Sequence, residues 1–331
     1  MRAFVAALVL LGLLACGSGG APSTSPAPTS PTPGAPQQGC ARTSVGFTPL
    51  TDLGSGSYQG QRGGLYPTGG NVPPPAHLDA GLKVARTIQP LDAAGQPSVS
   101  GRYVFVSIGM SNTTQEFSAF KPMADADPLK SSRLVVVDGA QGGMTATDWS
   151  NSGCACWGEL DNRLRAAGVT RAQVVTAWIK LADAQPSEGW PAYAQRLQRE
   201  TESILQQLAV NFPNLRLAYL SSRIYAGYAT STLNPEPYAY ESGFAMRWVI
   251  EDELNGALRY EGAGRNAPWL AWGPYLWADG TRPRSDGLTW VCADFSTADG
   301  THPATSGRQK VAQMLLDFVH NDQTARVWYS R

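Results

Sequence analysis

The chain has 331 residues, a formal net charge of zero and 43% hydrophobic residues. That length is enough for one large α/β domain with a full core, and the balanced charge gives no electrostatic reason to expect nucleic acid as a partner. Only 16% of the residues are charged, while 10 Trp and 12 Tyr are present, a mix that suits a secreted protein with an aromatic-lined surface or cleft.

The first residues are typical of an export signal. Residues 1–15 hold one Arg and then an apolar run that is too short for a convincing membrane-spanning helix. The sequence Leu-Leu-Ala-Cys at residues 13–16 resembles the bacterial lipobox, so we expect Cys16 to become the first mature residue and to carry a lipid. In the alternative, an ordinary secretory signal, Cys16 is incidental.

A tether and one domain are expected after the signal. Residues 16–39 are nearly all Gly, Ala, Pro, Ser and Thr and predict a disordered tether. Residues 40–331 predict one domain, in which the Gly- and Pro-rich residues 40–100 form an irregular lead-in. This order predicts an exported protein, lipid-anchored to the bacterial cell envelope, with the membrane as a partner through Cys16.

Four further cysteines favour disulfides, because an even number in an exported chain is typical of them. Three pairings of Cys40, Cys154, Cys156 and Cys292 are possible. The Cys-Ala-Cys segment is too tight to close comfortably on itself, so we expect Cys154 and Cys156 to pair with Cys40 and Cys292. A metal site is a weak alternative, because the spacing is not that of a zinc knuckle and the chain has only three His. We expect no metal and no cofactor.

Continuous apolar runs alternate with helical patterns from residue 103 onward. Runs without polar alternation predict strands that are buried on both faces of a sheet. Strand and helix in alternation predict a three-layer α/β/α domain with a central parallel sheet, whose active site lies at the carboxyl ends of the strands. The runs are residues 103–109, 133–139, 174–180, 215–221 and 268–278, and the helical patterns are residues 191–212, 243–260 and 305–319.

The first strand ends in Gly109-Met110-Ser111-Asn112. A serine at this place either caps the next helix or is a nucleophile held at the rim of the sheet. The tripeptide Gly-x-Ser alone is too common to decide between these two interpretations.

A second motif, Asp299-Gly-Thr-His302-Pro, precedes the last helical pattern. A hydrolytic serine needs a base that takes its proton, and that base needs an orienting carboxylate. An Asp three residues before a His on one short loop can supply both. His77, in the lead-in, and His320, at the end of the last helix, are poorer candidates.

A Gly-rich segment at residues 138–145 follows the second strand. Gly142 and Gly143 there allow backbone N–H groups to face an open cavity, as an oxyanion hole requires. Taken alone, the segment is more typical of an ordinary Gly-rich turn between a strand and a helix.

Together the three motifs resemble those of the SGNH (GDSL-like) hydrolases, in the carbohydrate-esterase-like branch with Gly-x-Ser-Asn. The resemblance covers residues about 100–320 and implies an SGNH or flavodoxin-like hydrolase fold. Ser111 matches the nucleophile, and Gly143, with Gly142 as the near alternative, matches the glycine whose N–H holds the oxyanion. Asp299 and His302 match the Asp-x-x-His of the last block.

One block departs from the family pattern. The family has Gly-x-Asn after the third strand, where Asn donates to the oxyanion, but here Leu181-Ala-Asp183 occupies that place. An ionised Asp183 would accept and would repel an oxyanion. Asp183 is therefore protonated, or it turns away while a group such as Lys180 contributes, or the match is off by a residue or two.

The resemblance implies a serine esterase that acts on an ester-bearing small molecule or glycan, with O-acetylated carbohydrate as the expected substrate. Aromatic and polar residues after the later strands either reach the rim of the cleft or belong to the core. Substrate-binding candidates are Asn112, Lys180, Arg223, Tyr225 and Trp290.

Two other functions remain open. Asp183 keeps open a non-catalytic glycan-binding envelope protein on a degenerate hydrolase scaffold. A thioesterase or peptidase of the same superfamily is the other alternative, because acyl transfer to serine does not fix the leaving group.

Overall fold

The computed structural model describes residues 39–67 and 69–330. The predicted signal at residues 1–15, the lipidation site Cys16 and the tether up to residue 38 lie outside the described residues. Within them, no helix is both long and apolar enough to cross a membrane.

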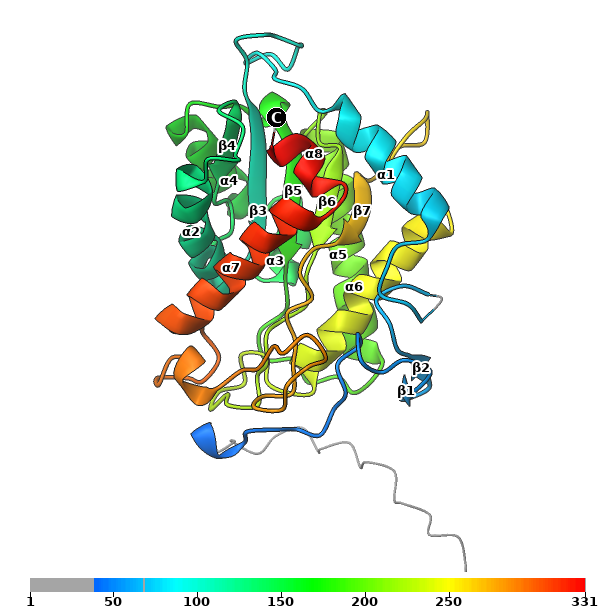
Figure 1. Cartoon of the computed structure of the whole chain (residues 1–331), viewed down its shortest axis with the longest axis vertical. Coiled ribbons are helices and arrows are strands. Elements are labelled where there is room, and N and C mark those ends of the chain that lie inside the picture. Colours follow the sequence, from blue (N-terminus) through cyan, green and yellow to red (C-terminus); the bar gives the residue numbers. More distant parts are fainter. Residues whose placement is uncertain (1–38, 68, 331) are drawn as a thin grey trace, which may run out of the picture. The chain divides into compact units, whose positions relative to one another are not determined.

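Five parallel strands form the central sheet, in the spatial order β4-β3-β5-β6-β7 (Figure 1). Every residue of β3, β5, β6 and β7 is buried, because helices cover both faces of the sheet. The three-layer α/β/α prediction is therefore confirmed. The strands are β3 (Tyr103–Gly109), β4 (Leu134–Val137), β5 (Val174–Lys180), β6 (Leu217–Leu220) and β7 (Trp269–Trp272).

The helices divide between the two faces, as right-handed crossovers require. One layer consists of α1 (Pro75–Thr87), α2 (Ser111–Ala126), α7 (Thr305–Asn321) and α8 (Ala325–Tyr329), of which α2 packs on α7 and α1 on α8. The other consists of α3 (Ala146–Ser150), α4 (Ala155–Ala166), α5 (Ala192–Asn211) and α6 (Tyr238–Leu254), with α5 packed on α6.

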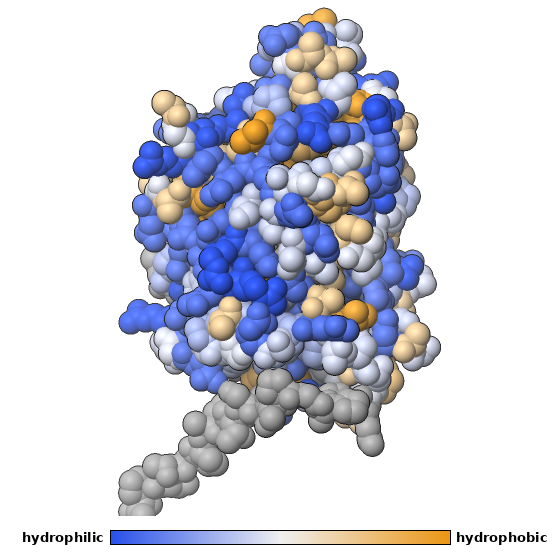
Figure 2. Space-filling view, turned by 180° about the vertical axis from the view of Figure 1, so that it is seen from behind, coloured by the Kyte–Doolittle hydropathy of each residue, from blue (hydrophilic) through white to orange (hydrophobic). Residues whose placement is uncertain are grey.

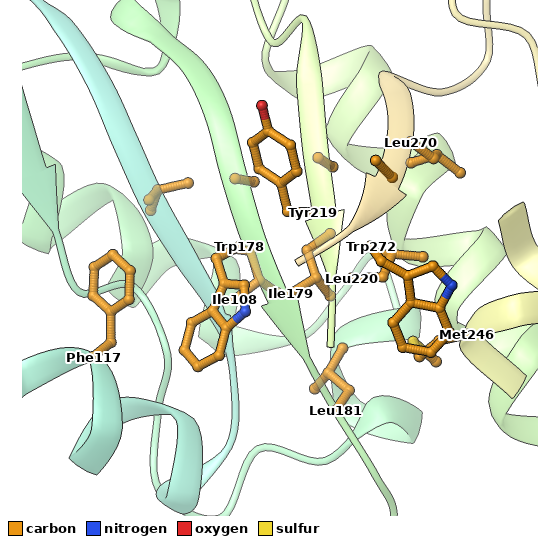
Figure 3. Close-up of a cluster of buried hydrophobic side chains, with 14 of the residues drawn as sticks. Ile108, Phe117, Trp178, Ile179, Leu181, Tyr219, Leu220, Met246, Leu270 and Trp272 are labelled. Carbon is orange, nitrogen blue, oxygen red and sulfur yellow. The ribbon is translucent and has the colours of Figure 1, made fainter. Parts of the chain in front are cut away.

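Most of the Trp and Tyr residues of the described chain are buried in the core. Figure 3 shows Trp178, Tyr219 and Trp272 among aliphatic side chains around the sheet, and all three are at least 95% buried. Trp178 also donates its indole N–H to Ser221 Oγ at 2.9 Å, so its polar atom is satisfied. The face seen in Figure 2 is mainly hydrophilic, with only scattered hydrophobic residues.

The lead-in contains more regular secondary structure than the sequence suggested. It contains a short hairpin of β1 (Ser57–Tyr58) and β2 (Gln61–Arg62), and then the 13-residue helix α1. Prolines stand at the start of α1, where their fixed φ suits the first turn. The prediction that residues 40–100 are irregular is wrong for α1. The amphipathic pattern of this helix is short and is flanked by Pro and Gly residues, which are typical of loops.

The disulfide pairing differs from the expected one. Cys40 bonds to Cys292, and Cys154 bonds to Cys156. The Cα atoms of Cys154 and Cys156 lie 5.1 Å apart, within the range of about 4.4–6.8 Å that a disulfide bridges. Ala155, the residue between them, is the first residue of α4, and its helical conformation brings the two Cα atoms this close, so the segment can close on itself.

Candidate active site

Ser111 and His302 meet at the carboxyl edge of the sheet. Ser111 is the first residue of α2, directly after β3, while His302 lies in the loop before α7. Ser111 Oγ lies 2.8 Å from His302 Nε2. The preceding residue, Met110, is the N-cap of α2, so Ser111 starts the helix without capping it, and its hydroxyl is engaged by the imidazole.

Asp299 orients the imidazole. Its Oδ2 lies 2.5 Å from His302 Nδ1, while its Oδ1 accepts from the backbone N–H groups of Thr301 at 2.9 Å and His302 at 3.0 Å. Burial alone would raise the pKa of the Asp299 carboxyl, but the hydrogen bonds from His302 and Thr301 outweigh it and hold the pKa below its usual value. Asp299 is therefore ionised at neutral pH and fixes the tautomer in which Nε2 accepts from Ser111.

Gly143 presents its backbone to the same place. It adopts φ +81°, a conformation that glycine takes without strain, and a Cβ there would meet nothing within 4 Å. A Cβ on Gly142 would lie 4.0 Å from Ser111 Cβ, so this segment passes directly beside the serine. The N–H of Ser111, in the first turn of α2, has no helical carbonyl partner and is available to a ligand.

A cavity of about 220 Å³ opens beside Ser111. Among the described residues of its wall, His302 has the only titratable side chain, so the cavity suits an uncharged group. A second cavity of about 230 Å³ lies at the opposite, amino-terminal edge of the sheet, next to Val175, away from Ser111. The wall of the first consists of Met110, Ser111, Asn112, Gly143, Thr145, Ala184, Leu233, Thr301 and His302.

Of the five substrate-binding candidates, only Asn112 lines this cavity, and its Nδ2 donates to Thr301 O at 2.9 Å. Tyr225 and Trp290 are fully buried, and their polar atoms bond to the carbonyls of Arg42 and Leu276. Both therefore belong to the core, one of the two expected alternatives, and Arg42 of the lead-in contacts Tyr225.

Lys180 and Arg223 are also buried beneath the site. Lys180 Nζ lies 2.5 Å from both carboxylate oxygens of Glu116 on α2, so it does not reach the oxyanion site. Burial lowers the pKa of Lys180 to about 8, although Glu116 opposes that shift. Arg223 is 1% exposed, and its three guanidinium nitrogens have no hydrogen-bond partner among the described residues.

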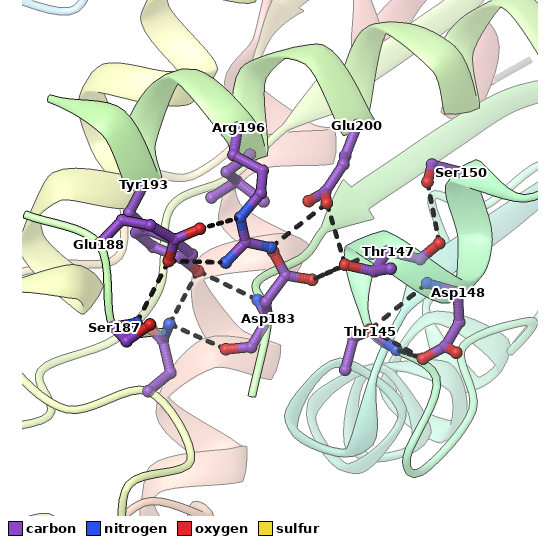
Figure 4. A network of polar contacts seen from close by, with 12 residues as sticks. Thr145, Thr147, Asp148, Ser150, Asp183, Ser187, Glu188, Tyr193, Arg196 and Glu200 are labelled. Atoms are coloured by element: carbon purple, nitrogen blue, oxygen red, sulfur yellow. Dashed lines mark hydrogen bonds and ion pairs between the residues drawn. The ribbon is translucent and has the colours of Figure 1, made fainter. Parts of the chain in front are cut away.

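Asp183 turns away from the cavity. Figure 4 shows its carboxylate between Thr147 and Arg196. Oδ1 accepts from Thr147 N at 3.0 Å, and Oδ2 lies 2.6 Å from Arg196 Nη1. The assignment of Asp183 as an oxyanion ligand is therefore not supported, and its neighbour Ala184 lines the cavity instead.

Sequence reasoning missed the role of Asp138. Its carboxylate accepts from Ser107 Oγ of β3 at 2.6 Å, from Thr114 Oγ1 and from Ser118 Oγ of α2 at 2.8 Å. It thus joins the helix of Ser111 to the start of the Gly-rich segment. A carboxylate directly before a Gly-rich turn was the available signal. Leu233, in contrast, carries no sequence signal that marks it as a cavity residue.

His77 and His320 lie outside the site. His77 Nε2 lies 2.8 Å from Leu270 O, and His320 Nε2 lies 2.6 Å from Asp127 Oδ2. Both are engaged in structural contacts, so His302 is the histidine that Ser111 contacts.

No family model and no curated protein matches the chain. Among solved structures, the chain is similar to the protein YxiM of Bacillus subtilis, with a TM-score of 0.38 and 13% identity, over 68% of this chain and 57% of that protein's length. A Bacteroides fragilis protein proposed to be an acylhydrolase gives a TM-score of 0.38 and 13% identity, over 77% of this chain and 100% of that one. A gut microbial diltiazem-metabolizing enzyme gives a TM-score of 0.37 and 13% identity, over 70% of this chain and 48% of that one. Since each TM-score is below 0.5, these likenesses carry no argument about activity.

Proposed function

We propose that this chain is a serine esterase of the SGNH type that hydrolyses carboxylic esters. The observation that carries the proposal is the unbroken chain of hydrogen bonds from Ser111 Oγ through His302 to Asp299, at the wall of a cavity. A base within hydrogen-bond reach of a hydroxyl, itself oriented by a carboxylate, is the arrangement that activates a serine nucleophile.

The proposed reaction has two halves. His302 Nε2 takes the proton of Ser111 as Oγ bonds to the ester carbonyl carbon, and the same imidazole then protonates the departing alcohol. The N–H groups of Ser111 and Gly143 donate to the oxyanion of each tetrahedral intermediate. In the second half His302 deprotonates a water that attacks the acyl-serine, and the proton returns to Ser111 as the acid leaves.

The cavity supports a short, uncharged acyl group. An apolar cavity of about 150 Å³ holds benzene, while pockets for drug-sized ligands measure about 300–1,000 Å³. The 220 Å³ beside Ser111 therefore suits an acyl group of a few carbons, against the apolar side chains of Met110, Ala184 and Leu233. An acetyl ester fits this limit. Carbohydrate as the alcohol part rests on the resemblance of the motifs alone.

We further propose that the enzyme acts outside the cytoplasm, anchored through a lipid on Cys16. The two disulfides support an oxidising compartment. The C16S variant should move from the membrane fraction to the soluble fraction of cells that export it, whereas an unchanged distribution would contradict the anchor.

Hydrolysis of p-nitrophenyl acetate, butyrate and octanoate, beside acetylated xylan and acetylated monosaccharides, tests the proposed activity. We expect the acetate to be the best simple ester and the octanoate to be poor. Ser111→Ala should lower kcat by about 10³-fold or more, because both halves of the reaction use its hydroxyl. Full turnover by Ser111→Ala would contradict the proposal.

A fluorophosphonate probe separates the alternatives. Labelling of the wild type but not of Ser111→Ala supports an activated serine. A folded wild type that takes no label would favour the non-catalytic glycan-binding protein. Hydrolysis of thioesters or peptides in preference to all oxygen esters would favour a thioesterase or peptidase of the same superfamily.

A further inference from the structure

Asp183 occupies the place where the sequence led us to expect an oxyanion donor, yet its charge is used elsewhere. Its side chain is 4% exposed. Oδ1 accepts from the backbone N–H of Thr147 at 3.0 Å and from its Oγ1 at 2.9 Å, and Oδ2 pairs with Arg196 at 2.6 Å (Figure 4). The backbone N–H of Asp183 donates to Tyr193 Oη at 3.0 Å.

Thr147 continues the segment that lines the cavity. Gly143 and Thr145 are in the cavity wall, and Thr147 follows two residues later in α3. The residue between them, Ala146, donates its N–H to Ala182 O at 3.1 Å. Residues 182–183 therefore hold the carboxyl end of the Gly-rich segment through three hydrogen bonds.

The amino end of the same segment is held by Asp138. Ala140 N donates to Asp138 Oδ1 and to Ser107 Oγ, both at 3.2 Å, and Gln141 N donates to Gly109 O at 2.9 Å. Between the two anchors lie Gly142 and Gly143, which have no side chain to fix them. The position of the Gly143 N–H relative to Ser111 thus depends on the two ends of the segment.

Arg196 balances the charge of Asp183. It lies on α5 and also contacts Glu188 at 2.7 Å and Glu200 at 3.3 Å. A buried carboxylate without a partner would be costly, and near an oxyanion it would oppose catalysis. Arg196 and Thr147 both contact the carboxyl group of Asp183, which therefore points away from the reacting atoms.

We propose that Asp183 is a positioning residue that fixes residues 139–147 so that the Gly143 N–H faces the oxyanion, a role that rests on the proposed esterase function. It acts through Thr147 and does not touch substrate. If Asp183 positions the Gly-rich segment, replacing it by Asn should lower kcat, whereas if Asp183 faced the oxyanion, the same replacement should raise kcat.

Asp183→Asn is that substitution. Asn keeps the size and one acceptor for Thr147 but cannot pair with Arg196, so we expect kcat to fall about 10-fold or more, with KM within about twofold of the wild type. If Asp183 faced the oxyanion, Asn would replace a repulsive acceptor by a donor and would raise kcat by about 10²–10³-fold. An increased or unchanged kcat overturns the proposal.

Glu188→Gln is the matched control. Glu188 also pairs with Arg196, but its side chain is 38% exposed and it has no contact with Thr147. We expect kcat within about twofold of the wild type. If Asp183→Asn does not fold, Thr147→Val takes its place. Thr147→Val removes one of the two contacts between Thr147 and Asp183. The proposal then requires kcat to fall, by less than the 10-fold expected for Asp183→Asn. An unchanged kcat overturns it.

Hydrogen exchange makes the test independent of activity. Backbone amides of residues 142–144 should exchange faster in Asp183→Asn than in the wild type, because one anchor of the segment is weakened. Unchanged exchange there contradicts the anchoring even if kcat falls. A wild type without Ser111-dependent turnover would contradict the proposed function, while the exchange result still decides whether Asp183 anchors the segment.

Discussion

The Thr147 hydroxyl has one hydrogen and faces two carboxyl groups, Asp183 at 2.9 Å and Glu200 at 2.9 Å. It can donate to only one of them, so the other contact needs a proton on the carboxyl group. Burial and then the neighbouring Asp183 raise the pKa of Glu200 to about 7, while Thr147 and Arg196 oppose that rise. A protonated Glu200 that donates to Thr147 Oγ1 leaves the Thr147 hydrogen for Asp183, while Glu200 Oε2 has no hydrogen-bond partner among the described residues.

This cluster predicts a pH-dependent stability. A carboxyl whose pKa is higher in the folded state than in the unfolded chain stabilises the fold fully below the unfolded value, and that contribution is lost as the pH rises through about 7. Glu200→Gln cannot ionise, so its Tm should fall less than that of the wild type between pH 5 and pH 8. Thermal unfolding followed by circular dichroism at several pH values measures the difference.

The comparison with wild type matters because Glu202 and Glu241 also have pKa values raised to about 7, mainly by burial, and contribute the same trend in both proteins. Parallel curves of Tm against pH for the wild type and Glu200→Gln would contradict a raised pKa of Glu200 in the folded state.

At the residue scale, the sequence indicates which of the three histidines lies beside Ser111 better than it indicates the residues around them. Ser111 directly follows β3, and Asp299 and His302 lie in the loop before α7, so both segments meet at the carboxyl edge of the parallel sheet. Tyr225 follows a strand in the same way, yet Arg42 covers it from a segment more than 180 residues away in the sequence. No local pattern encodes such a cover, so the sequence could not separate core from rim.

At the scale of elements, the junction of β3 and α2 depends on Gly109. A Cβ there would lie 2.4 Å from Thr113 Oγ1 and 2.5 Å from Lys180 O, closer than any real contact. Thr113 Oγ1 donates to that same carbonyl at 2.7 Å, so neither atom can withdraw without breaking the hydrogen bond. The strand β3 therefore turns into α2 in a space that admits only glycine.

Gly109→Ala should therefore destabilise the fold by about 1–3 kcal/mol, the usual cost of overpacking, and should displace Ser111. Urea unfolding measures the first effect and fluorophosphonate labelling the second. Gly158→Ala is the control, because a Cβ on Gly158 in α4 meets nothing within 4 Å, and Ala there should stabilise by about 0.5–1 kcal/mol. Equal effects of the two substitutions would show that crowding at Gly109 is not the cause.

The elements themselves were predictable where their pattern is continuous. All five apolar runs contain the strands, although the run 268–278 is a strand only at Trp269–Trp272 and then continues as buried loop. The helix α6 begins at Tyr238, five residues before the predicted start. Pro237 directly before the helix and Glu241 in its first turn are start signals, but the apolar stripe from which the helix was predicted begins only at Phe244.

At the scale of the whole molecule, the Cys40–Cys292 disulfide joins the beginning of the lead-in to the loop that precedes Asp299. The bond closes a loop with a sequence separation of 252 residues, whereas Cys154–Cys156 closes one of only 2. Because a cross-link restricts the unfolded chain more when its loop is longer, the two bonds should contribute unequally.

Removal of the long-range bond by Cys40→Ser with Cys292→Ser should lower the free energy of unfolding by about 2–5 kcal/mol. The double variant of Cys154 and Cys156 should lower it less. Urea unfolding of both variants and the wild type under non-reducing conditions measures the order, and a larger loss for the short loop would contradict it.

The same bond determines how the molecule responds to mechanical tension. If force is applied between the two ends of the chain, the covalent path runs from Cys40 through the sulfur atoms to Cys292 and bypasses residues 41–291 while the bond is intact. The tension acts instead on residues 293–331, which include Asp299, His302 and α7. Stretching would therefore separate His302 from Ser111 before any strand of the sheet is pulled apart.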